Sequence, residues 1–119
     1  MSAPSVPTPA DVYTLASPAV NIKDVVVPLL QYAVHMAYIH KLLFGAPMVI
    51  TSGKDSVHVA GSMHDQGKAI DIRLKDLSES DQIMFLCTLI WSAADNKVAV
   101  FDERALGAES HVHIEYHGD

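Results

Sequence analysis

The chain has 119 residues, of which half are hydrophobic and 18% are charged, and its formal net charge is −6 at pH 7. This length fits one domain, and this composition is sufficient for a hydrophobic core. The acidic balance, with no cluster of lysines and arginines longer than a pair, argues against a surface for nucleic acid or for an anionic membrane. The one cysteine, Cys87, excludes a disulfide within the chain, and we expect it to be a buried free thiol.

Residues 1–20 are rich in Pro, Ser, Thr and Ala and show no hydrophobic period. This composition predicts an extended arm, which seldom orders alone and which we expect to lie against a neighbouring subunit. The first residues have neither the basic start nor the apolar segment of a signal peptide. The domain itself is therefore expected to span residues 21–119.

Six elements are expected after the arm, in the order helix, strand, strand, helix, strand, strand. Their ranges are 24–44, 47–53, 68–74, 78–94, 98–103 and 111–117. Asn21 or Asp24 caps the first helix, whose polar residues indicate a core helix and not a membrane span. Ser78 or Ser80 caps the second helix, whose apolar residues at 83, 86, 87, 90 and 91 form one stripe. This order predicts an α+β domain with a mostly antiparallel sheet.

Alternation along two of the expected strands predicts which polar side chains share a face. In the strand at 68–74, Asp71 lies on the face opposite the isoleucines. In the last strand and just before it, one face is polar, with Glu109, His111, His113 and Glu115 opposite the apolar residues. If the apolar faces line the core, Asp71 and both histidines face one cleft. A sharp turn in the preceding loop would bring His64 over Asp71.

Two neutral imidazoles and one carboxylate form a three-ligand set that suits Zn²⁺ and leaves a fourth position for water. Zinc lowers the pKa of such a water to about 7, so an acid/base group must take its proton and pass it to a leaving amine. His111 and Glu109 are the candidates for this role. Each of these features alone also fits an ordinary surface or core residue, and only their combination favours a metal site.

The pattern S-x-H-x-x-G-x-A-x-D runs through residues 62–71. It resembles the zinc-ligand motif of the D-alanyl-D-alanine metallopeptidases and the phage L-alanyl-D-glutamate endolysins, in the superfamily of the lysostaphin-type enzymes and the Sonic hedgehog signalling domain. "HVHIEY" at 111–116 resembles the strand that carries the third ligand, and "VITSG" at 49–53 resembles the strand and turn before the motif. The resemblance covers roughly residues 25–117 and implies a hedgehog/D-Ala-D-Ala-peptidase-like fold.

The metal ligands that the resemblance implies are His64, Asp71 and His113. His111 matches the first histidine of an H-x-H form, implied to stabilise the transition state or to act as base. The family's E-x-x-H form would place a glutamate at position 110, where this chain has Ser110. Glu109 lies one residue away, so the general base stays open between His111 and Glu109.

Three residues are expected on the substrate side: Ser62, His58 and Asp55. Asp55 stands where many of these enzymes carry an arginine that grips a substrate carboxylate. An aspartate there would repel such a carboxylate and favour an internal bond or a stem peptide with a free amine. His58 either lines the cleft, lies behind a metal ligand, or is an ordinary polar loop residue.

The resemblance implies a zinc-dependent peptidase that cleaves the stem peptides of bacterial peptidoglycan. With no signal-peptide pattern, we expect a phage endolysin or virion-associated enzyme, located in the virion or in the host cytoplasm before release to the wall. The alternative is a virion structural or decoration protein with the same kind of domain, in which zinc only stabilises the fold and the peptidase activity is lost. The Pro-rich arm, Asp55 and the offset of Glu109 fit this alternative.

Overall fold

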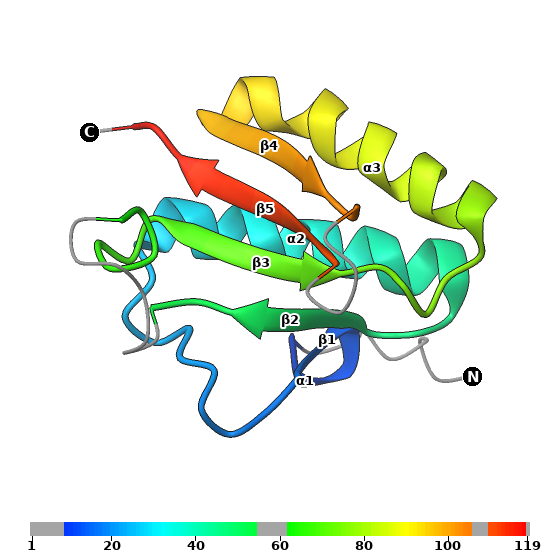
Figure 1. Ribbon diagram of the computed structural model, residues 1–119, viewed down its shortest axis with the longest axis horizontal. Coiled ribbons are helices and arrows are strands. Elements are labelled where there is room, and N and C mark those ends of the chain that lie inside the picture. The colour runs from blue at the N-terminus through cyan, green and yellow to red at the C-terminus, as the bar shows by residue number, and fades with distance from the viewer. Residues whose placement is uncertain (1–8, 55–61, 106–109, 119) are drawn as a thin grey trace, which may run out of the picture.

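The computed structural model describes residues 9–54, 62–105 and 110–118 of the chain. The elements in chain order are α1 (Pro9–Val12), β1 (Tyr13–Leu15), α2 (Val27–Phe44), β2 (Met48–Ser52), β3 (Ala69–Arg73), α3 (Glu79–Ala93), the 3₁₀ turn η1 (Ala94–Asn96), β4 (Val98–Glu103) and β5 (His111–Tyr116). The five strands form one sheet, and Figure 1 shows α2 running behind this sheet and α3 lying along its β4 edge.

The sheet has the strand order β1-β2-β3-β5-β4. β1 pairs with β2 in parallel, and the other three pairs of neighbouring strands are antiparallel. The prediction of an α+β domain with a mostly antiparallel sheet is therefore confirmed, and the sheet is mixed.

Part of the expected arm belongs to the domain, because residues 9–15 form α1 and the edge strand β1. Val12 is fully buried, while Tyr13 and Leu15 pack against the core. Two apolar positions in a three-residue strand are too few to show a period, so the pattern of the sequence does not reveal this strand.

The apolar faces of the strands pack against the helices. Ile70 and Ile72 of β3 and their partners on β5 are fully buried in one core with α2 and α3. The Tyr32 hydroxyl on α2 donates a hydrogen bond to the Leu89 carbonyl on α3 (2.7 Å), which joins the two helices on the same side of the sheet. Among the described residues, no helix covers the opposite face of the sheet (Figure 1). Because side chains alternate along a strand, the polar residues Asp71 of β3 and His113 of β5, which contact each other, lie on that face.

α2 begins at Val27, three residues later than predicted. The residues expected to cap it, Asn21 and Asp24, lie in the turn before the helix. No side chain caps this helix. The side chain of Asn21 instead accepts hydrogen bonds from the backbone N–H groups of Lys23 and Asp24, which forms a turn before the helix. The helix ends as expected at Gly45, whose N–H donates to the Lys41 carbonyl. In the described part of the chain, no helix has both the length and the apolar character needed to cross a membrane.

α3 begins as predicted, because the Ser78 hydroxyl accepts a hydrogen bond from the backbone N–H of Asp81 (3.2 Å). Its core face, however, consists of Phe85, Leu89 and Ala93. Most of the expected stripe is on the solvent side: Ile83, Cys87, Ile90 and Trp91 are exposed. The prediction that Cys87 is buried is therefore wrong. α3 carries apolar residues on both sides, so its pattern does not determine which side packs.

Two glycines bring the loop before β3 and the turn after β2 against the segment 21–26. The Val26 N–H donates to the Gly67 carbonyl (2.8 Å), and the Lys54 N–H, next to Gly53, donates to the Asn21 carbonyl (2.8 Å). A Cβ on Gly53 or Gly67 would collide with the backbone carbonyl oxygen of Asn21 or Asp24, respectively. Close backbone contact, which only glycine allows, therefore holds both turns in place.

We expect Gly67→Ala to destabilise the protein more than Gly45→Ala. Both glycines have a left-handed backbone, with φ of +70° and +69°, so both substitutions carry the cost of that conformation, about 1 kcal/mol. Only Gly67 also meets a backbone oxygen, whereas Gly45 faces open space, so Gly67→Ala should cost about 2–4 kcal/mol in total. Urea unfolding followed by circular dichroism measures both, and equal losses would contradict the close contact.

His40 is a buried polar residue of the helical layer. Its Nδ1 lies 2.8 Å from the Ala46 carbonyl oxygen, to which it donates as a neutral imidazole, and its ring packs edge-on against Phe44 and Phe85. Burial lowers the pKa of His40, and the hydrogen bond to Ala46 opposes this only in part. The folded protein therefore favours the neutral form of His40.

Below pH about 6.5, the ordinary pKa of histidine, the unfolded chain should bind a proton at His40 that the folded protein does not. The stability that His40 contributes is present above that pH and is lost as the pH falls, by up to about 1.4 kcal/mol per pH unit. We expect His40→Gln to lose less stability than the wild type between pH 7 and pH 5. Urea unfolding across this range tests the prediction, and parallel stability profiles would contradict it.

Candidate metal centre

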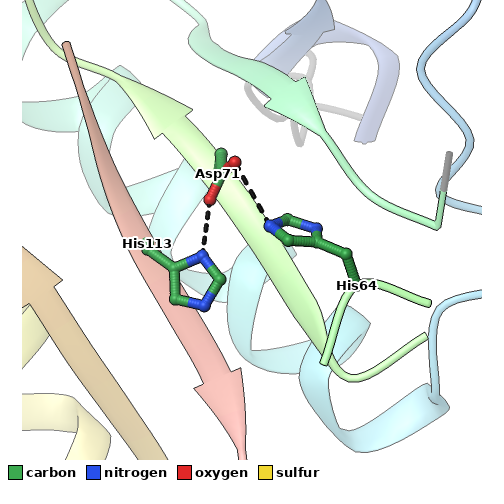
Figure 2. Close-up of side chains that lie close together, drawn as sticks. All are labelled: His64, Asp71 and His113. Atoms are coloured by element: carbon green, nitrogen blue, oxygen red, sulfur yellow. Dashed lines mark hydrogen bonds and ion pairs between the residues drawn. The ribbon is translucent and has the colours of Figure 1, made fainter. Parts of the chain in front are cut away.

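Asp71 lies at the centre of a group of three side chains that come from a loop and two strands. It is directly opposite His113 in the pairing of β3 with β5. Its Oδ1 lies 2.7 Å from His113 Nδ1, and its Oδ2 lies 3.2 Å from His64 Nε2 (Figure 2). The carboxylate is buried, and each of its oxygens faces one imidazole.

The loop 62–67 fixes the direction of His64. The Gly67 N–H donates to the His64 carbonyl (3.0 Å), and the Ser62 hydroxyl accepts from the Asp65 N–H (3.1 Å), so the loop is a tight turn. His64 Nδ1 lies 2.9 Å from the Gly53 carbonyl oxygen and must donate to it. Nε2 is therefore the nitrogen that faces the group, where it carries a proton toward Asp71 or, in the neutral ring, a lone pair for a metal ion.

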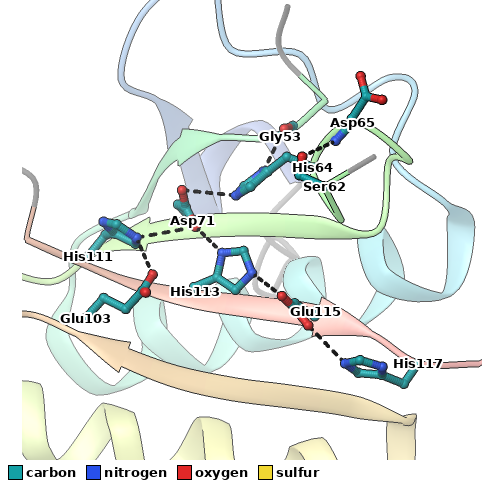
Figure 3. Close-up of polar contacts among 10 residues, drawn as sticks. All are labelled: Gly53, Ser62, His64, Asp65, Asp71, Glu103, His111, His113, Glu115 and His117. Atoms are coloured by element: carbon teal, nitrogen blue, oxygen red, sulfur yellow. Dashed lines mark hydrogen bonds and ion pairs between the residues drawn. The ribbon is translucent and has the colours of Figure 1, made fainter. Parts of the chain in front are cut away.

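His113 is held in the same way by a carboxylate. Its Nε2 lies 2.8 Å from Glu115 Oε1, while the other oxygen of Glu115 lies 3.0 Å from His117 Nε2 (Figure 3). A proton on His113 Nε2 leaves Nδ1 to face Asp71. Both histidines thus have an acceptor on the far side of the ring, the arrangement that orients metal-binding imidazoles in proteins.

The pKa directions follow from this geometry. Burial by itself raises the pKa of Asp71, but hydrogen bonds from His113 and His64 outweigh it and hold that pKa well below its usual range. Burial by itself lowers the pKa of both histidines, and their contacts with Asp71 raise it above the ordinary value. Without a metal, the group therefore favours an ionised carboxylate between two protonated imidazoles, and a metal ion would bind in exchange for the protons that the two rings carry toward Asp71.

His64, Asp71 and His113 can hold a metal ion, because each offers one ligand atom and these atoms lie within 4.8 Å of one another. Ligand atoms on a tetrahedral zinc are separated by roughly 3.3 Å, so only small side-chain movements are needed. The three residues therefore fit a metal ion in donor type, direction and spacing.

A second group, which shares His113, lies beside the first on β4 and β5. Glu103 is opposite His111 in the strand pairing, and its Oε1 lies 2.8 Å from His111 Nε2. The same nitrogen of His111 lies 3.7 Å from Asp71 Oδ1 (Figure 3). Phe101 is half-exposed on this face, with its ring centroid 5.8 Å from that of His113.

The structure thus brings together four of the predicted site residues: His64, Asp71, His111 and His113. Ser62 lies in the turn that carries His64, so its described contact supports the turn, and its expected role toward a substrate stays a prediction. Three predicted residues, Asp55, His58 and Glu109, lie outside the described residues. Glu115 shares the alternating face of β5 with His113, so the sequence could place it there but not show its contact with the ring. Glu103 was missed, since only the pairing of β4 with β5 shows that it reaches His111.

Comparison with protein-family models, with curated proteins and with solved structures finds no match to this chain. The family resemblance of residues 62–71 and 111–116 therefore stays a prediction. The cluster of two histidines and one carboxylate is observed in the structure and does not depend on this resemblance.

We expect removal of the metal to lower the melting temperature, because an ion bound only by the folded state stabilises that state. At a metal concentration one hundred times the dissociation constant, the stabilisation is about 2.7 kcal/mol, or roughly 10 °C for a domain of this size. Asp71→Ala should abolish the effect of a chelator. Thermal unfolding with and without added Zn²⁺ and chelator provides the measurement.

The matched control is Asp76→Ala, which removes an exposed carboxylate that pairs with Arg73 on the surface. This variant should keep the full response to the chelator. A wild-type protein that melts identically with Zn²⁺ and with chelator would show that the three residues hold no zinc.

Proposed function

We propose that this protein is a zinc-dependent peptidase that cleaves the stem peptides of bacterial peptidoglycan. The observation that carries the proposal is a group of two histidines and one aspartate that can hold a metal ion, with the hydrogen-bonded pair of Glu103 and His111 beside it. Three protein ligands with room for one more group are typical of catalytic zinc sites, whereas structural sites usually have four. Zinc at this position would supply Lewis acidity toward a carbonyl group and toward water.

The choice of zinc is supported by the donor set and by the motif. Two imidazoles and a carboxylate are borderline ligands that zinc accepts readily, although Fe²⁺ binds similar sets in oxygenases. The resemblance of residues 62–71 to a zinc-ligand motif favours zinc. Metal analysis of protein purified under anaerobic conditions distinguishes the two metals.

The choice of peptidoglycan is supported by the resemblance alone. Under this proposal the protein is a phage endolysin or a virion-associated enzyme. Asp55, at the position of a carboxylate-binding arginine in many such enzymes, would favour an internal bond or a stem with a free amine. Phe101, half-exposed beside His113, offers an apolar surface for the methyl groups of alanine-containing stems.

A second candidate is a virion structural or decoration protein in which the metal only stabilises the fold. One observation favours it: the solvent side of α3 carries Ile83, Ile90 and Trp91, and the Trp91 side chain is 86% exposed. Apolar surfaces of this kind are typical of contacts between proteins. The two candidates differ in whether the metal-loaded protein breaks a covalent bond.

We expect zinc-loaded wild-type protein to release peptide fragments from purified peptidoglycan, and chelator to stop the release. Asp71→Ala should be inactive because it removes a ligand between the two histidines, whereas Asp76→Ala should retain full activity. Mass spectrometry of the soluble products identifies the bond that is cleaved. If Asp55 disfavours a terminal carboxylate, substrates with blocked carboxyl groups should be cleaved at least as fast as substrates with free ones.

The absence of release from several types of peptidoglycan by protein shown to hold one zinc would favour the structural candidate. A strong preference for a free terminal carboxylate would leave the peptidase proposal in place but contradict the role of Asp55.

A further inference from the structure

Hydrolysis of an amide bond requires a group that accepts a proton from the attacking water and returns it to the leaving amine. Three carboxylates of the described residues contact the histidines of this centre: Asp71, Glu103 and Glu115. Their surroundings differ, and only one of them has a carboxylate that is both close to the group and open to solvent. The inference below rests on the proposed hydrolytic function.

Asp71 and Glu115 are already engaged by the histidines that hold the metal. Asp71 lies between His64 and His113, and both its oxygens face them. Glu115 uses one oxygen for His113 Nε2 and the other for His117 Nε2, on the side of His113 that faces away from Asp71 (Figure 3). Neither carboxylate is free to receive a proton from a water beside the metal.

Glu103 differs from Asp71 and Glu115 in that it is near the centre and also open to solvent. A carboxylate oxygen of Glu103 lies within 4.8 Å of a ring nitrogen of His113, and one water with two hydrogen bonds spans up to about 5.5 Å between its partners. The Glu103 side chain is 41% exposed, compared with 12% for Asp71, so water reaches it from the open face of the sheet. His111 fixes its direction through the contact of 2.8 Å between Nε2 and Oε1.

We propose that Glu103 is the general base and that His111 is its positioning residue. The Glu103 carboxylate accepts one proton from the attacking water while the water oxygen bonds to the carbonyl carbon. It returns this proton to the amide nitrogen as the carbon–nitrogen bond breaks, which yields a carboxyl group and an amine and restores the carboxylate. His111 Nε2–H donates a hydrogen bond to Glu103 and turns it toward the position of the water.

This assignment places the base on β4, the strand next to the one that carries His111 and His113. A sequence motif within one strand contains no information on a cross-strand partner, so Glu103 is not predicted from the pattern around His113. The register of β4 with β5 sets Glu103 opposite His111 and makes the pair possible.

The test compares two matched substitutions, Glu103→Gln and Glu115→Gln, in the full zinc-loaded protein. Both remove one negative charge and keep the shape of the side chain. Glu103→Gln should keep the zinc affinity and KM but reduce kcat by roughly 10²–10⁴-fold, the usual effect of a lost acid/base group. Glu115→Gln should instead weaken zinc binding by roughly 10–100-fold, because it loosens the support of a ligand.

Competition with a chromophoric chelator measures the zinc affinities, and soluble stem-peptide fragments serve as substrates. A further readout independent of activity is the ring tautomer of His111, obtained from long-range ¹H–¹⁵N NMR spectra. The Nε2–H tautomer should predominate in the zinc-loaded wild type, and Glu103→Ala should reduce its population. An unchanged tautomer in Glu103→Ala would overturn the positioning role of His111.

The possible results of the activity and zinc measurements separate a failure of this inference from a failure of the proposed function. Full activity of Glu103→Gln beside an active wild type overturns this inference and leaves the proposed function intact. Loss of zinc from Glu103→Gln also overturns it, since Glu103 would then be a fourth ligand. An inactive but zinc-loaded wild type refutes the proposed function itself, and with it the need for a base.

Discussion

The site depends on one carboxylate held between two imidazoles. Asp71 is buried in the middle of a sheet, where an unpaired charge is unfavourable by several kcal/mol. His113 on the adjacent strand and His64 on the loop compensate for this charge, and each is directed by an acceptor of its own, Glu115 or the Gly53 carbonyl. The charge of Asp71 is therefore compensated only when three parts of the chain are folded together: the loop 62–67, the turn after β2, and the strands β3 and β5.

The register of β3 with β5 is the structural condition for this arrangement. Alternation along a strand means that a shift of one residue would turn His113 into the core and bring Val112 to the open face. The fully buried isoleucines of β3 and their apolar partners on β5 oppose such a shift, because exposing each of them would cost roughly 2 kcal/mol. Hydrophobic packing on one face thus determines the positions of the polar groups on the other.

The sequence predicts the elements and most of the centre, and its failures have physical reasons. Strands β3 and β5 alternate clearly, so the shared face of Asp71, His111 and His113 could be predicted without a structure. β1 is too short to show a period, and α3 is apolar on two sides, so neither the added strand nor the exposure of Cys87 could be predicted. Glu103 meets His111 only through the pairing of β4 with β5, which local sequence does not encode.

The exposure of Trp91 has a practical consequence for spectroscopy of this protein. It is the chain's one tryptophan, and it lies on the solvent side of α3. Its indole is already in water in the folded state, so its emission should shift little when the domain unfolds or takes up an ion. The buried Tyr32, whose hydroxyl bonds to Leu89, is the better intrinsic chromophore for the packing of the two helices.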